Sequence, residues 1–406
     1  MNMIKLQGLK GFRDFLPSQA RKRQYVIDTF KRVFESYGFE PLETPALEYE
    51  EILLGKYGGE GDKLMYRFVD NGKRKVALRY DQTVPLARVV AQYQNQLPLP
   101  FKRYQIQPVW RAENTQKGRF REFLQCDIDT VGVSSPLSDA EIIEVAAKSL
   151  EKLGFKDFRI RINDRKTFQD IDKKAITILD KLNKIGEENV KKELINKKIV
   201  TNLSEATLLL DRIRASKPTQ YLQEILTTIN ALGVESSLCV YSPTLARGLD
   251  YYTGMIFEIE IEGYSSGSVC GGGRYDKLIG MFAAKNIPAV GCAFGFDRII
   301  EAMDELKVFP VDLVTTKVLV TIFSKDLKEK SLEAASYLRL KNINTEIYLD
   351  ENSSLEKQLK YADKKQIPYV AIIGPEEASR NQVTLRSMKT RAQETLSIED
   401  TPKKII

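Results

Sequence analysis

Histidine does not occur among the 406 residues of the chain. Its absence excludes the commonest general base in enzymes, together with Ser–His and Cys–His nucleophile pairs and His-ligated metal sites. Any chemistry must therefore use carboxylates, arginines, tyrosines, backbone groups or the substrate itself. Such a set of groups favours reactions that proceed by charge stabilisation and positioning.

Cysteines and long apolar runs are also scarce. The four cysteines, Cys126, Cys239, Cys270 and Cys292, are far apart, without the spacing of a zinc site or the density of a disulfide scaffold. We expect them to be reduced core residues. No stretch approaches the apolar length of a membrane span, and residues 1–10 lack the apolar core of a signal peptide. These absences predict a cytoplasmic protein that does not enter a membrane.

The usual phosphate-binding loops are missing as well. The chain has neither a Gly-x-x-x-x-Gly-Lys-Ser/Thr loop nor a Rossmann glycine fingerprint after a strand. Its composition, 43% hydrophobic and 29% charged, is that of a globular protein with two or three domains. The net charge of +7 fits a polyanionic partner such as RNA, although solvated Lys-rich helices alone would also produce it.

The most informative segment is a predicted β-hairpin over residues 101–129. Apolar and polar residues alternate in both strands, so that one face is apolar and the other is polar. The polar face contains Arg103, Gln105, Gln107, Arg111, Glu113, Arg121, Phe123, Gln125, Asp127 and Asp129. Arginines, carboxylates and a glutamine that converge on one surface indicate a site, and a solvated sheet face is the alternative.

The first part of the chain is predicted to mix helices and strands. Helical spacing and turn residues predict the following elements: a helix over 19–37, an extended segment over 39–47, strands over 64–69 and 75–80, and a helix over 81–94. The segment over 39–47 contains Pro41 and Pro45, which suit a sheet edge or a subunit contact.

The second part changes character twice. Residues 164–233 are Lys-rich with Leu/Ile periodicity, which predicts an all-helical insertion; a solvated helical spacer is the alternative. A strand over 253–262 follows, and then a strand-to-helix passage over 289–306 and a linker over 307–316. The last part alternates apolar runs (318–323, 345–349, 369–373) with helical patterns (327–340, 355–364), which predicts a small parallel sheet covered by helices.

Three further features remain open from the residues alone. Gly271–Gly273 either permits a crowded backbone or binds phosphate. The segment 245–254 holds an arginine, a carboxylate and two tyrosines between glycines, as if to bind a polar group. Arg298, beside Asp297, is either a site residue or half of a routine surface ion pair.

Taken together, these segments resemble the histidyl-tRNA synthetases, a family of class II aminoacyl-tRNA synthetases, over nearly the whole chain. Residues 10–17 resemble the amino-terminal signature of the family. The segments ending at Pro45, over 111–129 and over 291–298 resemble class II motifs 1, 2 and 3. The segment 247–252 resembles the element that separates the histidine enzymes from other class II synthetases.

The resemblance implies an α+β fold: a six- or seven-stranded class II antiparallel sheet flanked by helices, a helical insertion and a carboxy-terminal α/β domain that binds the anticodon. The expected division of the chain is as follows: a first catalytic part over 1–163, the insertion over 164–238, a second catalytic part over 239–308, a linker over 309–316 and the anticodon-binding domain over 317–406. The resemblance also implies a homodimer.

The resemblance assigns roles residue by residue. The expected catalytic residues are Arg111 and Arg247. The expected ATP-binding residues are Arg111, Glu113, Arg119, Arg121, Phe123 and Arg298, where Phe123 stacks on adenine and Arg119 or Arg121, with Arg298, holds the outer phosphates. The expected histidine-binding residues are Asp81, Thr83, Gln125, Asp129, Tyr251 and Tyr252. No side chain is expected to form a protein metal site.

The implied histidine pocket satisfies both sides of the substrate. Asp81 and Thr83, with Gln125, would bind the α-amino group, while Asp129 and Tyr252 would bind the two imidazole nitrogens. Such a pocket discriminates strongly, so that an editing domain is unnecessary, and none is visible in the sequence. Bacterial members commonly have Glu where this chain has Asp81 and Asp129, so that the pocket has to close slightly further.

The implied activity is that of a histidine–tRNA ligase. ATP and Mg²⁺ would convert L-histidine to histidyl-adenylate, which would then be transferred to tRNA(His) without a protein base. The alternatives are the histidine-sensing regulatory subunit of ATP phosphoribosyltransferase and a non-catalytic RNA-binding, synthetase-like module. Compositional drift in a Lys- and Ile-rich chain is the preferred account of the absence of histidine. The alternative is that an enzyme without histidine can still be made when charged His-tRNA is scarce.

Overall fold

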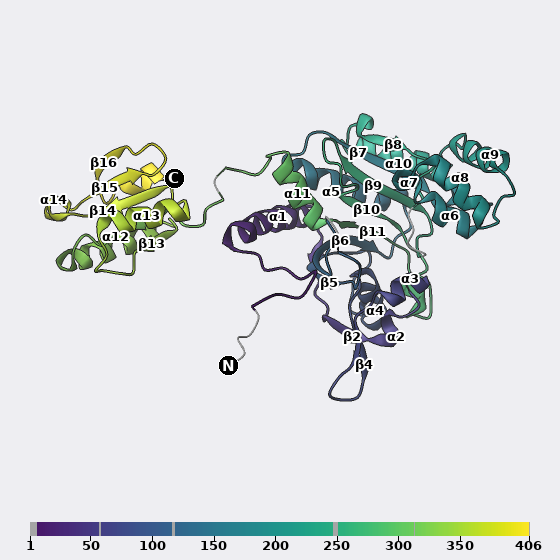
Figure 1. Ribbon diagram of the computed structural model, residues 1–406, viewed down its shortest axis with the longest axis horizontal. Helices are drawn as coiled ribbons and strands as arrows, with labels where there is room; N and C mark the ends of the chain where they lie inside the picture. The colour runs from purple at the N-terminus through teal and green to yellow at the C-terminus, as the bar shows by residue number, and fades with distance from the viewer. Residues whose placement is uncertain (1–5, 57, 116–117, 247–250, 312, 406) are drawn as a thin grey trace. The chain divides into compact units, whose positions relative to one another are not determined.

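The computed structural model describes residues 6–56, 58–115, 118–246, 251–311 and 313–405. The chain forms two compact units, Met1–Phe309 and Pro310–Ile406. Figure 1 shows a large sheet with helices in the first unit and a smaller sheet with helices in the second. The division falls within the predicted linker, whereas the full set of domain boundaries remains a prediction.

The first unit is built on an eight-stranded sheet with the order β1-β5-β6-β11-β10-β9-β7-β8. Its strands are β1 (Glu40–Pro41), β5 (Phe101–Trp110), β6 (Glu122–Val131), β7 (Phe158–Asp164), β8 (Cys239–Tyr241), β9 (Met255–Ile261), β10 (Cys270–Arg274) and β11 (Ala289–Phe294). In this order, each strand from β5 through β6, β11, β10 and β9 to β7 pairs antiparallel with the next. The two edge strands pair parallel, β1 with β5 and β8 with β7. The sheet thus exceeds the six or seven predicted strands because two short edge strands extend it.

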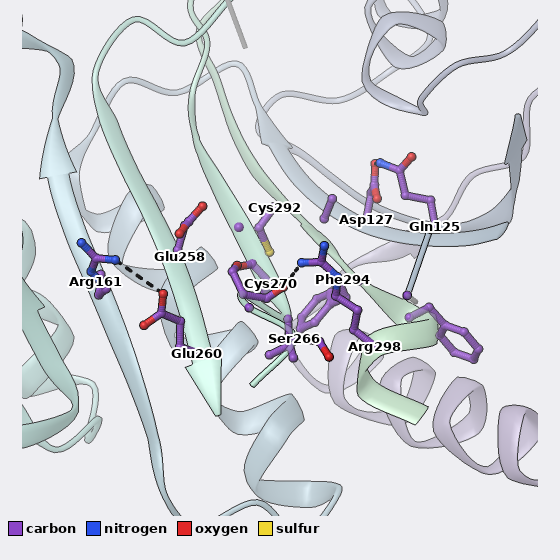
Figure 2. Close-up of a pocket in the computed structure, with 18 of the residues that line it drawn as sticks. Gln125, Asp127, Arg161, Glu258, Glu260, Ser266, Cys270, Cys292, Phe294 and Arg298 are labelled. Atoms are coloured by element: carbon purple, nitrogen blue, oxygen red, sulfur yellow. Dashed lines mark hydrogen bonds and ion pairs between the residues drawn. The ribbon is translucent and has the colours of Figure 1, made fainter. Parts of the chain in front are cut away.

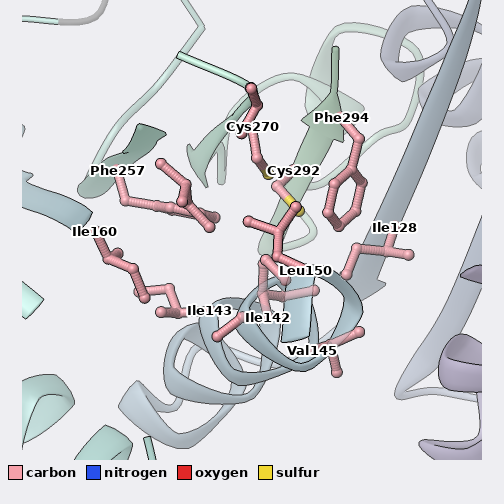
Figure 3. Packing of buried hydrophobic residues seen from close by; sticks show 14 of the residues in the cluster. Ile128, Ile142, Ile143, Val145, Leu150, Ile160, Phe257, Cys270, Cys292 and Phe294 are labelled. Carbon is pink, nitrogen blue, oxygen red and sulfur yellow. The ribbon is translucent and has the colours of Figure 1, made fainter. Parts of the chain in front are cut away.

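Helices pack on the apolar face of this sheet and form the main core. They are α1 (Pro17–Ser36), α5 (Pro136–Lys152), α10 (Gln220–Ala231) and α11 (Phe296–Glu305). Figure 3 shows Ile142 and Leu150 of α5 packed near Ile128 of β6 and Phe257 of β9. Since side chains alternate along a strand, the same strands turn their intervening residues to the opposite face.

A smaller sheet and α4 flank the first strands of the large sheet. The elements are β2 (Leu47–Tyr49), α2 (Glu50–Leu53), α3 (Gly58–Lys63), β3 (Arg67–Val69), β4 (Lys75–Leu78), α4 (Thr83–Gln92) and η3 (Ile279–Met281). The antiparallel sheet has the order β2-β4-β3. Its strands confirm the predicted hairpin around Asn71, and α4 begins two residues after Asp81.

The predicted insertion is helical in the structure. It contains η1 (Arg165–Phe168), α6 (Lys173–Leu179), α7 (Leu182–Ile185), α8 (Glu187–Asn196), α9 (Leu203–Arg214), α10 and η2 (Ser236–Leu238). The first helices share a core of their own around Val190 and Leu210. The last helix differs, because Leu222 and Ile225 of α10 belong to the main core beside α5. In the described part of the chain, no helix has the length and apolar content that crossing a membrane requires.

The second unit contains a five-stranded sheet with the order β13-β12-β14-β15-β16. Its elements are β12 (Val318–Val320), η4 (Lys325–Leu327), α12 (Lys328–Leu340), β13 (Thr345–Ile347), α13 (Leu355–Lys365), β14 (Tyr369–Ile372), α14 (Pro375–Ser379), β15 (Gln382–Ser387), β16 (Gln393–Ser397) and α15 (Thr401–Ile405). The three predicted strands are parallel, as expected. The antiparallel hairpin β15-β16 was not predicted.

A buried ion pair joins three elements of the first unit. Arg274, at the end of β10, contacts Asp139 of α5 through Nη2 at 2.9 Å, and the side chains are only 4% and 0% exposed. Tyr221 of α10 donates its hydroxyl to the same carboxylate. A charge buried to this degree is stable only while its partners are present.

We expect Asp139→Ala to lower the free energy of unfolding by about 3 kcal/mol, because Arg274 would lose its buried carboxylate and keep only the partly exposed Asp276 as a counter-ion. Urea denaturation of the full chain followed by circular dichroism would measure the loss. Glu356→Ala is the control, since Glu356 and its partner Lys360 are both 75% exposed and this pair contributes nothing measurable. Equal stability of the two variants would contradict the role of the buried pair.

Candidate active site

A cavity of about 1180 Å³ lies over the polar face of the large sheet. It brings together predicted site residues from distant parts of the sequence: Asp81, Thr83, Arg111, Glu113, Arg119, Phe123, Gln125, Asp129, Tyr251, Tyr252 and Arg298. Figure 2 shows the labelled lining residues on several neighbouring strands. Part of the polar face of the predicted hairpin, including Arg111, Gln125 and Asp129, therefore forms a cavity wall.

Two predicted residues need separate mention. Arg121 is not among the lining residues; its Nε donates to the backbone oxygen of Glu113 at 3.1 Å. Arg247 lies outside the residues that the structure describes, as do the other residues of 247–250. Arg119, the alternative to Arg121, does line the cavity.

Asp129 is held in place by its neighbours on both sides. Arg103 lies directly opposite in β5, and its Nη2 is 2.7 Å from Asp129 Oδ2. Tyr275, just after β10, donates its hydroxyl to Asp129 Oδ1. On the other neighbouring strand Asp129 faces Gly291, where a Cβ atom would lie 1.9 Å from Asp129 Oδ1. The carboxylate thus fits only because residue 291 lacks a side chain.

Burial shifts the proton equilibria of this wall. Burial raises the pKa of Asp129 above its usual value, while the charge of Arg103 opposes the shift. Burial also raises the pKa of Asp127 well above its usual value; the charge of Arg103 opposes this rise, and the charges of Asp129 and Asp81 add to it. Burial raises the pKa of Tyr275 in the same way, so this phenol remains a donor. The wall therefore favours ligands that bring positive charge or N–H donors.

The tyrosines form the side of the cavity next to Asp81. The ring of Tyr251 lies 4.9 Å from that of Tyr252 and 5.8 Å from that of Tyr275, measured between centroids. Asp81 Oδ1 accepts a hydrogen bond from the backbone N–H of Val84 at 3.1 Å, at the start of α4. The start of α4 thus fixes the orientation of the Asp81 carboxylate.

Arg111 is placed by aromatic and backbone contacts. Its Nε donates to the Tyr80 backbone oxygen at 3.0 Å, and its guanidinium carbon lies 4.4 Å from the Tyr80 ring centroid and 5.2 Å from that of Phe123. Arg298 donates from Nη1 to the Ser268 backbone oxygen at 2.7 Å. Such anchored guanidinium groups suit the binding of phosphate or carboxylate.

The amino-terminal signature supports the motif 2 hairpin. The Gly11 backbone oxygen accepts the Arg121 N–H at 2.9 Å, and the Arg13 guanidinium lies 3.1 Å from the centroid of the Phe120 ring, which lines the cavity. Asp297 pairs with Arg13 at 3.0 Å and with Arg23 at 2.6 Å. The sequence left open a surface ion pair between Asp297 and Arg298. In the structure Asp297 pairs with arginines of the amino-terminal region instead.

Sequence reasoning missed several residues of the site. Arg103 and Asp127 were placed on the polar face but received no role, and Tyr275 was not considered. The register offers a signal for Arg103, since it lies opposite Asp129 in the predicted hairpin. Tyr275 offered none, because its contact with Asp129 spans 146 residues of sequence. The Gly271–Gly273 cluster serves close packing at Gly272, where a Cβ atom would lie 2.2 Å from the Gly291 backbone oxygen.

Among the described residues, no group of three or more Cys, Asp or Glu side chains is arranged to hold a metal ion. Carboxylates nevertheless line the cavity, including Glu113 and Glu258. Mg²⁺ usually binds to proteins through one or two carboxylates together with substrate phosphates. These donors fit an ion that arrives with a nucleotide.

Comparisons with known proteins agree with this geometry. The family model of histidyl-tRNA synthetase matches residues 11–299, and that of an anticodon binding domain matches residues 317–406. A histidine–tRNA ligase of Cytophaga hutchinsonii is 39% identical over 98% of both chains. The crystal structure of histidyl-tRNA synthetase from Nostoc sp. PCC 7120 is 32% identical, with a TM-score of 0.87 over 99% of both chains.

A further solved structure has the same fold, and its name combines two kinds of protein. It is that of an ATP phosphoribosyltransferase regulatory subunit/histidyl-tRNA synthetase from Bacillus halodurans, with a TM-score of 0.74. The two sequences are 20% identical over 89% of this chain and 97% of that chain. An identity this low supports a shared fold but not a shared function.

The antiparallel sheet and its cavity are those of a class II aminoacyl-tRNA synthetase. Within that class, the chain belongs to the histidyl-tRNA synthetase family. The family and the fold class predicted from the sequence are confirmed.

We expect Asp127→Asn to stabilise the ligand-free protein at neutral pH. Because the folded-state pKa of Asp127 is raised, its contribution to stability is complete below the ordinary value of 3.8 and is lost as the pH rises through the raised pKa. Asparagine removes this loss, which is about 1.4 kcal/mol for each unit of pKa shift. Urea denaturation at pH 4 to 8 measures the free energy of unfolding of both proteins. The difference between them should grow in favour of the variant as the pH rises, and a variant less stable than the wild type at pH 8 would contradict the prediction.

Proposed function

We propose that the protein is a histidine–tRNA ligase that activates L-histidine with ATP and transfers it to tRNA(His). The observation that carries the proposal is the single cavity in which the anchored Asp129 and Tyr252 share one space with Arg111 and Arg298. One part of this set suits a small nitrogen-rich side chain, and the other suits phosphates. Membership of the histidyl-tRNA synthetase family supports both assignments.

The proposed histidine pocket uses groups at opposite ends of the amino acid. Asp129 and Tyr252 bind the two ring nitrogens, since neutral imidazole offers one donor and one acceptor. Asp81, Thr83 and Gln125 bind the α-amino group, and Tyr251 supports the pocket from its position beside Tyr252. A buried polar pocket of this kind rejects side chains that leave its groups unpaired.

The proposed nucleotide site uses the arginines of the same cavity. Arg111 binds the α-phosphate and the substrate carboxylate, and Phe123 stacks on adenine. Arg298 with Arg119 binds the outer phosphates, and the position of Arg119 in the cavity wall supports it over Arg121. Glu113 pairs with Arg119 at 3.3 Å and holds that flexible side chain near the site.

In the proposed first step, an oxygen of the histidine carboxylate attacks the α-phosphorus of ATP. The new P–O bond forms as the bond to the β-phosphate oxygen breaks, and pyrophosphate leaves without a proton transfer. Arg111 and Arg247 neutralise the charge on the α-phosphate. Glu113 and Glu258 would hold Mg²⁺, which would supply positive charge for the leaving phosphates.

In the second step, the terminal ribose hydroxyl of tRNA attacks the acyl carbon of the adenylate. The bond between that carbon and the phosphate oxygen breaks, and AMP leaves. The hydroxyl proton passes to a phosphate oxygen of the substrate, so that no protein base is required. This route agrees with a chain that contains no histidine.

The regulatory-subunit alternative is less well supported. A histidine sensor would need neither phosphate-binding arginines nor an anticodon-binding domain. In this chain, however, Arg111 and Arg298 line the cavity, and residues 317–406 match an anticodon binding domain. That domain supports the proposal of tRNA as a partner. A non-catalytic RNA-binding module would likewise have no use for the enclosed pocket around Asp129.

We further propose that the enzyme is a homodimer and acts in the cytoplasm. Strand β1 lies at the edge of the large sheet, as predicted for a subunit contact. Nearby in sequence, Leu47 and Tyr49 of β2 are 41% and 52% exposed although they are large and apolar. Exposed apolar side chains on neighbouring positions are typical of protein interfaces.

The assay for the proposed function is the exchange of pyrophosphate into ATP. We expect exchange with L-histidine and none with the other amino acids. Arg111→Ala should reduce kcat/KM by about 10²–10³-fold, because one guanidinium is lost from the developing charge. Arg74→Ala, which changes an exposed arginine paired with Asp70 far from the cavity, is the control. Absence of histidine-dependent exchange in the wild-type protein would overturn the proposed function.

Arg247→Ala should separate chemistry from binding. We expect adenylate formation to fall by orders of magnitude with little change in the dissociation constant for histidine, because the proposed contact is made to the α-phosphate during attack. Single-turnover kinetics and calorimetric titration with histidine measure the two effects. Unaltered exchange of pyrophosphate would remove Arg247 from the mechanism.

A further inference from the structure

Strand β6 places Gln125 and Asp127 next to each other on the cavity wall. Both side chains point to the same face because they are two residues apart. Gln125 Nε2 donates to Asp127 Oδ2 at 3.0 Å, and the two residues are 7% and 2% exposed. Figure 2 shows the two side chains reaching toward each other from the strand.

This contact fixes the orientation of the Gln125 amide. When a bound cation ionises Asp127, its carboxylate can only accept hydrogen bonds, so the amide nitrogen faces Asp127 and the amide oxygen points elsewhere. Gln125 Oε1 and Asp127 Oδ1 are both buried and lack a hydrogen-bond partner among the described residues. Buried acceptors without partners are costly, and because both residues line the cavity, a ligand with N–H donors would satisfy them.

The surrounding charges specify a cationic donor. The charge of Arg103 favours the ionised form of Asp127, while the charges of Asp129 and Asp81 oppose it. Three carboxylates therefore line this part of the cavity beside one guanidinium group. Arg103 forms its ion pair with Asp129. An ammonium group would add the missing positive charge and up to three N–H donors.

The position of Asp127 favours the α-ammonium group over the imidazole ring. Burial raises the pKa of Tyr251, and the charges of Tyr252, Asp81 and Asp127 add to the rise, while a hydrogen bond with Thr83 opposes it. Asp127, Asp81 and Thr83 all line the cavity with Tyr251. Asp129, in contrast, is engaged by Arg103 and Tyr275 on its other side. Asp127 therefore groups with Asp81 and Thr83, the proposed amino-binding residues.

We propose that Asp127 is a substrate-binding residue that completes the α-ammonium site. It turns the Gln125 amide so that Oε1 accepts from the ammonium group, and its own Oδ1 adds a second acceptor. The inference rests on the proposed function and goes beyond it, because it assigns Asp127 a role that sequence reasoning did not give it.

The test compares ligands with and without the ammonium group in Asp127→Asn. Asparagine removes the charge and lets the Gln125 amide turn. We expect the KM for histidine in pyrophosphate exchange to rise about ten- to hundredfold and the KM for ATP to stay unchanged. Histidinol, which keeps the ammonium group, should weaken as an inhibitor by a similar factor. 3-(Imidazol-4-yl)propanoate, which lacks that group, should inhibit both forms within twofold.

Asp164→Asn is the matched control. Asp164 is also a buried aspartate, 1% exposed at the end of β7, and it is not among the lining residues of the cavity. Its KM for histidine should equal that of the wild type. Urea denaturation checks that both variants are folded.

Two outcomes would overturn the role of Asp127. An unchanged KM for histidine would make the Gln125 contact purely structural. An equal loss of inhibition by the propanoate would place Asp127 against the ring or the carboxylate. Failure of the proposed function is a different result, since it appears in the wild type as exchange that does not depend on histidine.

Discussion

The site depends on a carboxylate that is buried in the middle of a sheet and still available to a ligand. Asp129 occupies this position because Arg103 lies opposite on one strand, Gly291 leaves room on the other, and the Tyr275 hydroxyl reaches it from beyond β10. An unpaired carboxylate here would cost several kcal/mol. The surrounding residues therefore stabilise a charge that lines the cavity.

The two faces of the same strands divide the work of the first unit. Cys126 and Ile128 of β6 pack beneath α5 in the main core, while the intervening Asp127 and Asp129 line the cavity. A displacement of β6 by one residue would exchange the two sets. The stability of the core thus fixes the register of the site, and the ion pair of Arg274 with Asp139 connects the helical layer to the strand that precedes Tyr275.

The crowding of acidic groups around Asp127 opposes the stability of the ligand-free protein. Burial and neighbouring charges raise the pKa of Asp127, so that its ionised form is unfavourable at neutral pH. Binding sites often retain such strain because it is relieved by the ligand. Because the chain contains no histidine, the proposed histidine pocket has carboxylates, phenols and amides as its polar groups.

The sequence by itself determined the family, the fold class and most of the local elements. Alternation over residues 101–129 predicted a polar face, and the motif order identified the histidyl-tRNA synthetase family because these patterns depend on neighbours along the chain. Only the tertiary structure decided the two parallel edge strands, the hairpin β15-β16 and the packing of α10 on α5. It also placed Arg119 rather than Arg121 in the cavity wall and brought Tyr275 to Asp129. Such contacts join residues far apart in sequence, and no local period encodes which distant side chain fills a given space.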